Sequence, residues 1–197
     1  MPVQQLFLGR GGSAPESFEY FYDGSTSTSM VIPAGVSFFK VAGVAAGSPG
    51  SNGPNSHTSG VPGGGGFATA GDLALFHQAL LHGGLPGTDE LWSKDTRQDV
   101  RRIRSGDLTD MMFKRPANRA LGLIISGDDS RNFRGFGKTN SPLAFGHNGA
   151  GGQLAWADPA TGLSLGYVTP GHDRNSIRQG SRGVAISSIA AQCARQL

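Results

Sequence analysis

Most side chains that could do chemistry in this sequence stand in patterns that fit no metal or nucleotide site. Cys193 is the single cysteine, so neither an internal disulfide nor a cysteine-based zinc site can form. His77 and His82 are five residues apart without a partner acid, which does not match the ligand spacing of a zinc-binding helix. The four glycines at 63–66 lack the Gly-Lys-Ser/Thr that closes a phosphate-binding loop. We therefore expect no metal and no cofactor.

One motif has a context that is typical of a catalytic site. His147, Asn148 and Gly149 end an apolar run and open a glycine-rich turn. A His-x-Gly triplet alone is weak evidence, and His82 with Gly84 also matches it. The match at His147 differs because it follows a capped helix and a basic region and precedes an Asp-Pro hairpin. The simpler alternative is a histidine at a strand end that bonds a backbone carbonyl.

Two longer segments resemble a known family. GGGGFATAGDL, at 63–73, leads into a helix that ends in ALLHGG, and FGHNGAGGQLAWADPATGLSLGYVTPG, at 145–171, contains the His147 motif and the hairpin. Together they resemble the last helix and final sheet of class C β-lactamases, penicillin-binding esterases and D-alanyl-D-alanine carboxypeptidases. The His147 motif stands where this family has Lys-Thr-Gly or His-x-Gly. The likeness covers about 63–190 and implies acyl transfer by a serine.

The resemblance implies roles for five residues at this motif. In such enzymes a serine attacks a carbonyl, and the strand beside the site offers a backbone N–H to the oxyanion. His147 would replace the cationic or hydrogen-bonding side chain that faces the nucleophile, and Gly149 would let substrate approach the strand closely. Ala150 would supply the oxyanion N–H. Asn148 would either turn away or touch substrate, and Gly151 is a further substrate-binding candidate.

The nucleophile is the main departure from the family. Its Ser-x-x-Lys motif should lie well over a hundred residues before the His motif, with a Tyr-x-Asn between them, and no tyrosine here has Asn two residues on. Ser37 and Lys40 form a Ser-x-x-Lys, but glycines follow at once where the family's serine opens a long helix. Both stay catalytic candidates, whereas the simpler interpretation places Ser37 in an edge strand or turn. We expect a C-terminal half that lacks its nucleophile.

Local signals predict two helices in the middle of the chain. Thr69 and Asp72 form a capping box for a helix over 70–82, which Gly83 and Gly84 end. The face expected to be buried comprises Leu73, Phe76, Ala79 and Leu80. Ser93 can cap a second helix over about 94–104, which should lie on the surface.

Short apolar runs then predict a sheet. They lie at 120–126, 143–147, 153–157 and 163–169. Asp158 to Gly162 has the residues of a turn, so the last two runs should form a hairpin. A helix over about 175–194 places Ile177, Val184, Ile186, Ile189 and Ala190 where they could cover one face of the sheet.

The sequence predicts three regions. Residues 1–42 form an N-terminal segment of undetermined packing, in which Phe18, Tyr20 and Tyr22 alternate as in a strand. Residues 43–66 contain nine glycines and are predicted to form a loop. This loop either lines the site or is a flexible joint between 1–42 and the rest of the chain. Residues 67–197 form the β-lactamase-like C-terminal region.

Charge and hydropathy restrict the partners. The net charge of +3 comes mainly from arginines, which cluster between 97 and 119. Acidic residues interleave with them and no aromatic pattern accompanies them, which favours a solvated surface over a nucleic-acid interface. No apolar stretch approaches the length of a membrane span, and the N-terminus lacks a signal-peptide pattern, so the cytoplasm is the default expectation.

We expect an α+β fold, with an antiparallel sheet of about four strands flanked by helices, as in the C-terminal part of the β-lactamase/transpeptidase-like fold. The favoured function is a serine hydrolase of the esterase or lipase type that acts on a small ester or acyl substrate. Esterase is preferred to β-lactamase because His147 in place of lysine removes a fixed positive charge. The alternative is a non-catalytic remnant or binding module that takes a peptide or acyl ligand. An uncovered sheet face should favour a homodimer or a partner chain.

Overall fold

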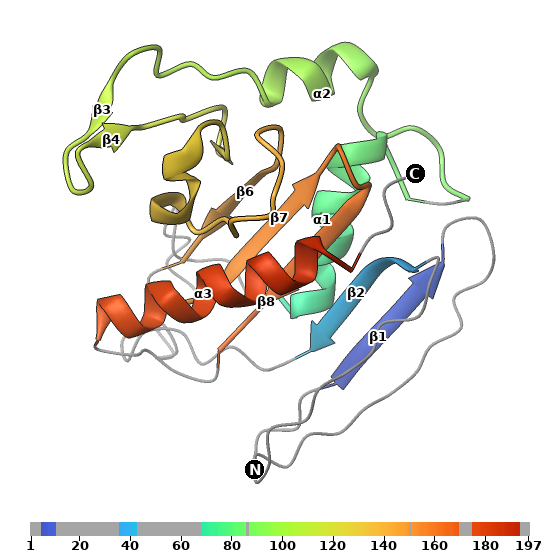
Figure 1. Ribbon diagram of the computed structural model, residues 1–197. Coiled ribbons are helices and arrows are strands. Elements are labelled where there is room, and N and C mark those ends of the chain that lie inside the picture. The colour runs from blue at the N-terminus through green and yellow to red at the C-terminus, as the bar shows by residue number, and fades with distance from the viewer. Residues whose placement is uncertain are drawn as a thin grey trace, which may run out of the picture.

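The computed structural model describes residues 5–10, 36–42, 68–85, 87–149, 151–169 and 175–193, the first two ranges as backbone strands. Within these ranges the chain forms a six-stranded sheet in the order β1-β2-β8-β7-β6-β5 (Figure 1). Its strands are β1 (Gln5–Arg10), β2 (Val36–Ala42), β5 (Ile124–Ile125), β6 (Phe145–Asn148), β7 (Leu154–Asp158) and β8 (Leu163–Tyr167). Neighbouring strands are antiparallel except β2 and β8, which are parallel.

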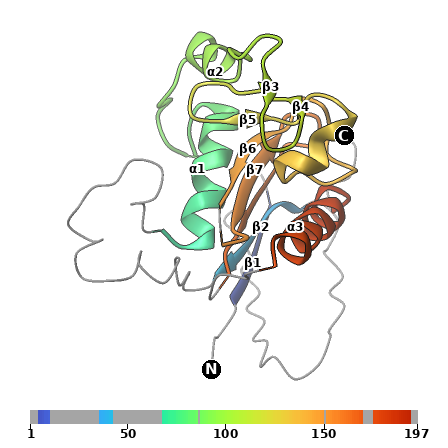
Figure 2. The same cartoon turned by 90° about the vertical axis from the view of Figure 1, so that its left-hand side faces the viewer.

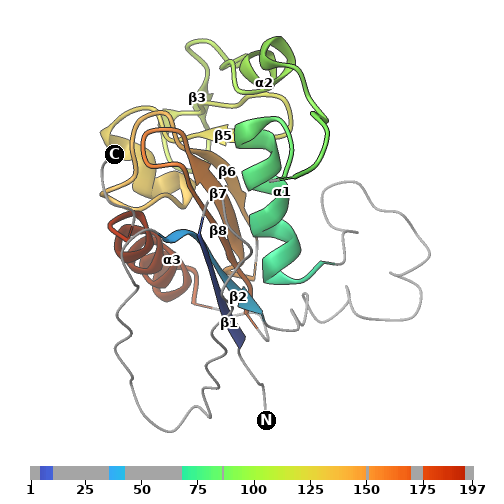
Figure 3. The ribbon, with the colours of Figure 1, turned by 90° about the vertical axis from the view of Figure 1, so that its right-hand side faces the viewer.

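The remaining elements surround this sheet. The helices are α1 (Ala70–His82), α2 (Lys94–Val100) and α3 (Ser176–Ala191), with a 3-10 helix, η2, at Asp129–Arg134. A small two-stranded sheet pairs β3 (Thr109–Asp110) with β4 (Arg115–Pro116). Helices α1 and α3 cover opposite faces of the large sheet (Figures 2 and 3). The expected α+β fold is confirmed, and no helix in the described ranges is long and apolar enough to cross a bilayer.

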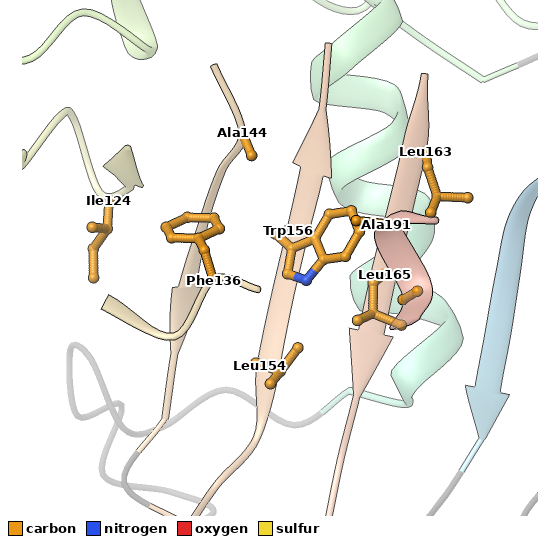
Figure 4. Close-up of a cluster of buried hydrophobic side chains, with 9 residues drawn as sticks. Ile124, Phe136, Ala144, Leu154, Trp156, Leu163, Leu165 and Ala191 are labelled. Atoms are coloured by element: carbon orange, nitrogen blue, oxygen red, sulfur yellow. The ribbon is translucent and has the colours of Figure 1, made fainter. Parts of the chain in front are cut away.

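Alternating side chains of the central strands supply two apolar cores. On the α3 side Trp156 lies at the middle of a buried cluster (Figure 4). That cluster comprises Ile124, Phe136, Ala144, Leu154, Trp156, Leu163, Leu165, Ala190 and Ala191. On the α1 side the cluster comprises Leu80, Leu81, Leu123, Ile125, Phe145 and Ala157. Because successive residues of a strand point to opposite faces, one short strand such as β7 serves both cores.

The predicted hairpin is confirmed. β7 and β8 pair antiparallel, with Asp158 opposite Leu163 at the turn. Gly162 has φ of +69°, a conformation that other residues adopt with strain. The buried carboxylate of Asp158 accepts hydrogen bonds from the backbone N–H groups of Ser141, at 2.7 Å, and Ala160, at 3.0 Å. The turn is therefore tied to the loop that precedes β6.

Helix α1 forms where the capping box predicts it, and Ala79 and Leu80 are buried as predicted, but the rest of the predicted face is wrong. Phe76 is 49% exposed, whereas Ala70 and Ala74 are buried. The reason is close packing on β8, because a Cβ on Gly166 would lie only 2.0 Å from the carbonyl oxygen of Ala70. A large side chain at this contact would force the helix away from the sheet, so alanines occupy it.

Three other expectations need correction. Helix α2 lies on the surface as predicted and is capped by Ser93, but it ends at Val100 instead of about 104. The apolar run 120–126 is not one strand, because Gly122 has φ of +69° and turns the chain, leaving β5 with two residues. In α3, Ile177 and Ile189 are exposed, and the small residues Gly183, Ser187, Ala190 and Ala191 are buried.

The loop 43–66 and the alternating aromatics at 18–22 lie outside the described residues.

Candidate active site

His147 lies on β6, where its strand extends past its outer neighbour. Strand β5 pairs with Phe145 and Gly146 only, so the last two residues of β6 reach beyond it. The side chain of His147 is exposed and, by the alternation along the strand, points to the same face as Phe145. This is the face that α1 covers. The end of β6 therefore leaves room for a ligand beside the histidine.

Two contacts determine the state of the His147 ring. Its Nδ1 lies 2.6 Å from the carbonyl oxygen of Asn148, and its Nε2 lies 3.3 Å from Nη1 of Arg119. A carbonyl oxygen can only accept a hydrogen bond, and a guanidinium can only donate one. The proton therefore belongs on Nδ1, and Nε2 accepts from Arg119. In this arrangement His147 accepts a hydrogen bond from a cation.

Arg119 reaches the histidine through a tight turn. The backbone N–H of Ala120 donates to the carbonyl oxygen of Leu123 at 2.8 Å, and an isolated bridge places Arg119 opposite Ile124. Ile124 in turn pairs with Gly146, the residue before His147. The backbone of Arg119 thus lies two strand positions outside β6, at a register from which its long side chain reaches the ring.

The loop before Arg119 holds its backbone in place. The Oγ of Ser105 accepts from the Arg119 N–H at 3.0 Å, and the Arg119 carbonyl oxygen accepts from the N–H of Arg104 at 2.7 Å. The preceding residue, Asn118, has φ of +48° and donates through Nδ2 to Oδ2 of Asp128 at 3.0 Å. Asparagine tolerates this left-handed conformation better than most residues. The position of Arg119 is therefore set by its surroundings.

Asp128 is the centre of the hydrogen bonds that support this turn. It accepts from the Ser130 N–H at 2.7 Å and lies 3.1 Å from Nη2 of the buried Arg134. Partial burial acts to raise the pKa of Asp128, but the hydrogen bonds from Ser130 and the charge of Arg134 outweigh it and hold that pKa well below its ordinary value. Asp128 is therefore an anion under ordinary conditions, anchoring the chain on both sides of β5.

A second carboxylate contacts Arg119 directly. Oδ2 of Asp110 lies 3.6 Å from Arg119 Nη2, and Oδ1 of Asp110 accepts from the N–H groups of Met112 and Phe113 at 2.9 and 3.1 Å. The Phe113 N–H, against a smaller opposing effect of desolvation, lowers the pKa of Asp110, and Arg119 adds to the decrease. Asp110 is therefore a fixed anion that orients the guanidinium.

A pocket of about 430 Å³ opens beside these residues. It is lined by Arg119, Ala120, Gly122, Leu123 and His147, so it has one polar end and one apolar wall. Its size lies in the range of ordinary small-molecule sites. Among the described residues that line it, none is a serine, threonine or cysteine. The described lining residues can therefore position and polarise a ligand, and none of them is a hydroxyl or thiol nucleophile.

Among the described residues of the His147 motif, only His147 lines this pocket. Asn148 points to the opposite face, where its Cβ lies 2.8 Å from the position of a Cβ built on Gly135. The N–H of Gly149 donates to the carbonyl oxygen of Gln153 at 2.7 Å, and the carbonyl oxygen of buried Gly151 accepts from Thr169 Oγ1 at 2.8 Å. Ala150 lies outside the described residues. The structure thus brings His147 together with Arg119, which sequence reasoning treated as part of a solvated basic cluster.

The sequence after Arg119 contains a turn pattern, but 120–126 was interpreted as one continuous strand. Leu121 and Gly122 can form a two-residue turn, which places Arg119 opposite Ile124. Treating 120–126 as one strand hid that register.

Comparisons with known proteins identify the family of this chain. A sequence model of the beta-lactamase family matches residues 13–185. This chain belongs to the beta-lactamase family. It is 31% identical over 108 residues to the esterase/beta-lactamase LipL of Mycobacterium tuberculosis, covering 55% of this chain and 23% of LipL. It also resembles the crystal structure of a beta-lactamase from Mycobacterium bovis, with 26% identity and a TM-score of 0.54 over 70% of this chain and 50% of that one. The chain therefore spans half or less of the length of these relatives.

Membership in the family makes the place of Ser37 and Lys40 informative. Both belong to β2, a strand, and not to the start of a helix. Lys40 pairs with Gly166, which is opposite Ala155, which is opposite His147. With strands about 4.8 Å apart, three steps separate the backbones of Lys40 and His147 by roughly 14 Å. The side chains of β2 lie outside the description, so the absence of a nucleophile at Ser37 remains a prediction.

Proposed function

We propose that this chain forms the sheet side of a serine hydrolase of the esterase type, which transfers an acyl group to water. The observation that carries the proposal is the convergence of His147 and Arg119, 3.3 Å apart, on a pocket with an apolar wall. Membership in the beta-lactamase family and the similarity to LipL support acyl chemistry. The polar end would hold the reacting carbonyl, and Ala120 and Leu123 would contact the acyl chain.

In this proposal His147 orients the reacting groups and does not act as the nucleophile. Its Nε2 accepts from Arg119, so the pair presents the remaining N–H donors of the guanidinium in a fixed arrangement. The Gly149 N–H is already bonded to Gln153, which leaves the N–H of Ala150 as the proposed oxyanion donor. The attacking serine would come from another segment, since none of the described pocket-lining residues is a serine.

We also propose that this chain associates with a second copy of itself or with another chain. Leu108, Met111 and Met112 are 69%, 75% and 81% exposed, and they lie within or beside the hairpin β3–β4, which also contains Asp110. Soluble monomers rarely keep such apolar groups uncovered. We therefore propose that the chain forms a homodimer or docks onto a partner chain. Sedimentation at micromolar concentration should show a species larger than the monomer, and a compact monomer would contradict this part.

Activity assays test the nucleophile. The 197-residue chain should neither react with a fluorophosphonate nor hydrolyse p-nitrophenyl butyrate, and Ser37→Ala should change neither result. Hydrolysis that is lost on Ser37→Ala would overturn the assignment of the nucleophile to another segment.

The role of His147 needs a complete site. Where the upstream coding region reads in frame into a Ser-x-x-Lys segment, the longer product should hydrolyse the ester. There His147→Ala should lower kcat/KM by about 100-fold, the scale of a lost positioned catalytic group. His82→Ala, at the exposed end of α1, is the matched control and should have little effect. An inactive longer product, or equal effects of the two changes, would favour a non-catalytic binding module.

A further inference from the structure

The hairpin β3–β4 carries a group of exposed apolar side chains. Leu108, Met111 and Met112 are the most exposed of them, and Phe113 and Phe133 are 41% and 40% exposed. The rings of Phe113 and Phe133 contact each other, with their centroids 5.9 Å apart. These five residues make up the hairpin patch. The hairpin lies at the end of the molecule that is farthest from β1 (Figure 1).

The backbone at the tip of the hairpin makes its hydrogen bonds internally. Oδ1 of Asp110 accepts from the N–H groups of Met112 and Phe113 at 2.9 and 3.1 Å. The carbonyl oxygen of Asp110 accepts from the Lys114 N–H at 2.8 Å. An apolar medium penalises peptide groups that lack such partners. These three N–H groups can therefore leave water without losing a hydrogen bond.

Two cations beside the hairpin patch have no carboxylate partner among the described residues. Lys114 and Arg115 are exposed, and none of the ion pairs in the described ranges includes them. The guanidinium of Arg115 instead lies over the ring of Phe133, 5.7 Å from its centroid. Residues 99–119 contain six Lys or Arg and three Asp, a net charge of +3 that equals the net charge of the whole chain. The excess positive charge of the protein is therefore concentrated in the segment that contains the hairpin.

We propose that the hairpin patch binds an anionic lipid surface. Met111 and Met112 enter the apolar layer, and Lys114 and Arg115 contact the anionic headgroups, which combines the two contributions on which interfacial binding depends. A two-fold dimer built on the same patch would bring the cations of both copies together, and like charges repel. Lipid is therefore the stronger occupant, and it should displace the association between chains proposed above.

The hairpin adjoins the pocket. Oδ2 of Asp110 lies 3.6 Å from Nη2 of Arg119, which lines the pocket. A lipid surface on the hairpin patch would therefore lie beside the pocket. The binding itself requires no acyl chemistry, so it goes beyond the proposed function and can be tested without it.

Cosedimentation of the 197-residue chain with lipid vesicles tests the proposal. One set of vesicles contains phosphatidylcholine alone, and the other also contains phosphatidylglycerol, which is anionic. At low salt the chain should partition into the anionic vesicles at least about tenfold more strongly, because each of the two cations contributes about fivefold. Added salt should weaken this preference.

Variants locate the binding. Met111→Ser combined with Met112→Ser should weaken binding to the anionic vesicles by about tenfold, because apolar surface is lost while the charge is unchanged. Lys114→Gln should weaken it by about fivefold and leave binding to neutral vesicles unchanged. Ile189→Ser and Lys138→Gln are the matched controls, since both residues are exposed, on α3 or beside it, and outside the hairpin. Neither control should change the binding.

The outcomes distinguish the possible occupants of the hairpin patch. Equal binding to both kinds of vesicle would refute the role of the cations. No binding to either kind, or binding that survives the double change at Met111 and Met112, would overturn the proposal. If that double change turns a dimer into a monomer while vesicles stay unbound, the occupant is a second copy. Hydrolysis of p-nitrophenyl butyrate by the longer product tests the pocket separately, so either proposal can fail alone.

Discussion

The β7–β8 hairpin and the segment 104–122 that delivers Arg119 are held by different forces. All five residues of β7 and four of the five in β8 are buried, and both apolar cores contain residues of this hairpin. The segment 104–122 depends on hydrogen bonds and ion pairs of Ser105, Asp110 and Asp128, which are partly exposed. Burial stabilises the scaffold, whereas polar contacts near the surface set the position of the pocket's cation. Mutations should therefore separate stability from ligand recognition.

The largest effect on the scaffold should follow from Trp156→Ala. Trp156 is 1% exposed, lies at the middle of the core under α3 and donates from Nε1 to Ser187 Oγ at 3.1 Å. Its removal should lower the free energy of unfolding by about 3–5 kcal/mol. Urea denaturation measures the change, and Trp92→Ala, at a half-buried tryptophan, should cost less. A loss below about 1 kcal/mol for Trp156→Ala would refute the ranking of the two regions.

The second-largest loss of stability should follow from a substitution in the turn of the hairpin. Asp158→Ala removes a fully buried acceptor and leaves the N–H groups of Ser141 and Ala160 without their partner. Because Ser141 is half-buried and Ala160 is exposed, water can replace part of these hydrogen bonds, and we expect a decrease of roughly 1–3 kcal/mol in the free energy of unfolding. Asp107→Ala, at an exposed carboxylate, is the control and should change it little. Equal effects of the two substitutions would mean that the turn does not depend on Asp158.

Acid should weaken helix α1, which packs on the hairpin, and the turn beside Arg119, each in its own pH range. Burial lowers the pKa of His77, on α1, below its ordinary 6.5, so the unfolded chain takes up this proton first and stability falls as pH drops below about 6.5. The pKa of Asp128 is held below its ordinary 3.8, so its contribution is complete above that value and is lost as pH falls further. Unfolding measured against pH should show both losses, and Asp128→Asn should flatten only the lower one. A profile unchanged by that substitution would exclude the role of Asp128.

The smallest effect on stability should come from Arg119→Gln. Arg119 is half exposed, so the free energy of unfolding should change by about 0.5 kcal/mol or less. The ring of His147 should nevertheless respond, because Nε2 loses the guanidinium that donates to it. The ¹⁵N signals of His147 at neutral pH should show the Nδ1–H tautomer in the original chain and a shift toward the other tautomer in the variant. Identical signals in both proteins would show that the contact does not fix the ring.

Local residue chemistry predicted the scaffold and failed at the pocket's cation. The capping box of Thr69 and Asp72 located α1, and Asp158 to Gly162 located the hairpin, because each signal lies within a few neighbouring residues. The burial of Ala70 and Ala74 in place of Phe76 was missed because the close approach of Gly166 to Ala70 is a contact between distant segments.

Arg119 was missed for a similar reason. The contact between Arg119 and His147 depends on the register of three strand segments and on the turn at Gly122. No single stretch of sequence contains that register. The two side chains are 28 positions apart in the sequence, yet they are 3.3 Å apart in the fold.

A crystal structure of the 197-residue chain with N-butyryl-4-nitroaniline tests the central claim most directly. The account predicts the ligand in the pocket of Arg119, Ala120, Gly122, Leu123 and His147, with its carbonyl at the polar end and its acyl chain against Leu123. The contact between Arg119 and His147 should persist beside it. An empty pocket at saturating ligand, or a ligand whose acyl chain points away from Leu123, would contradict the account.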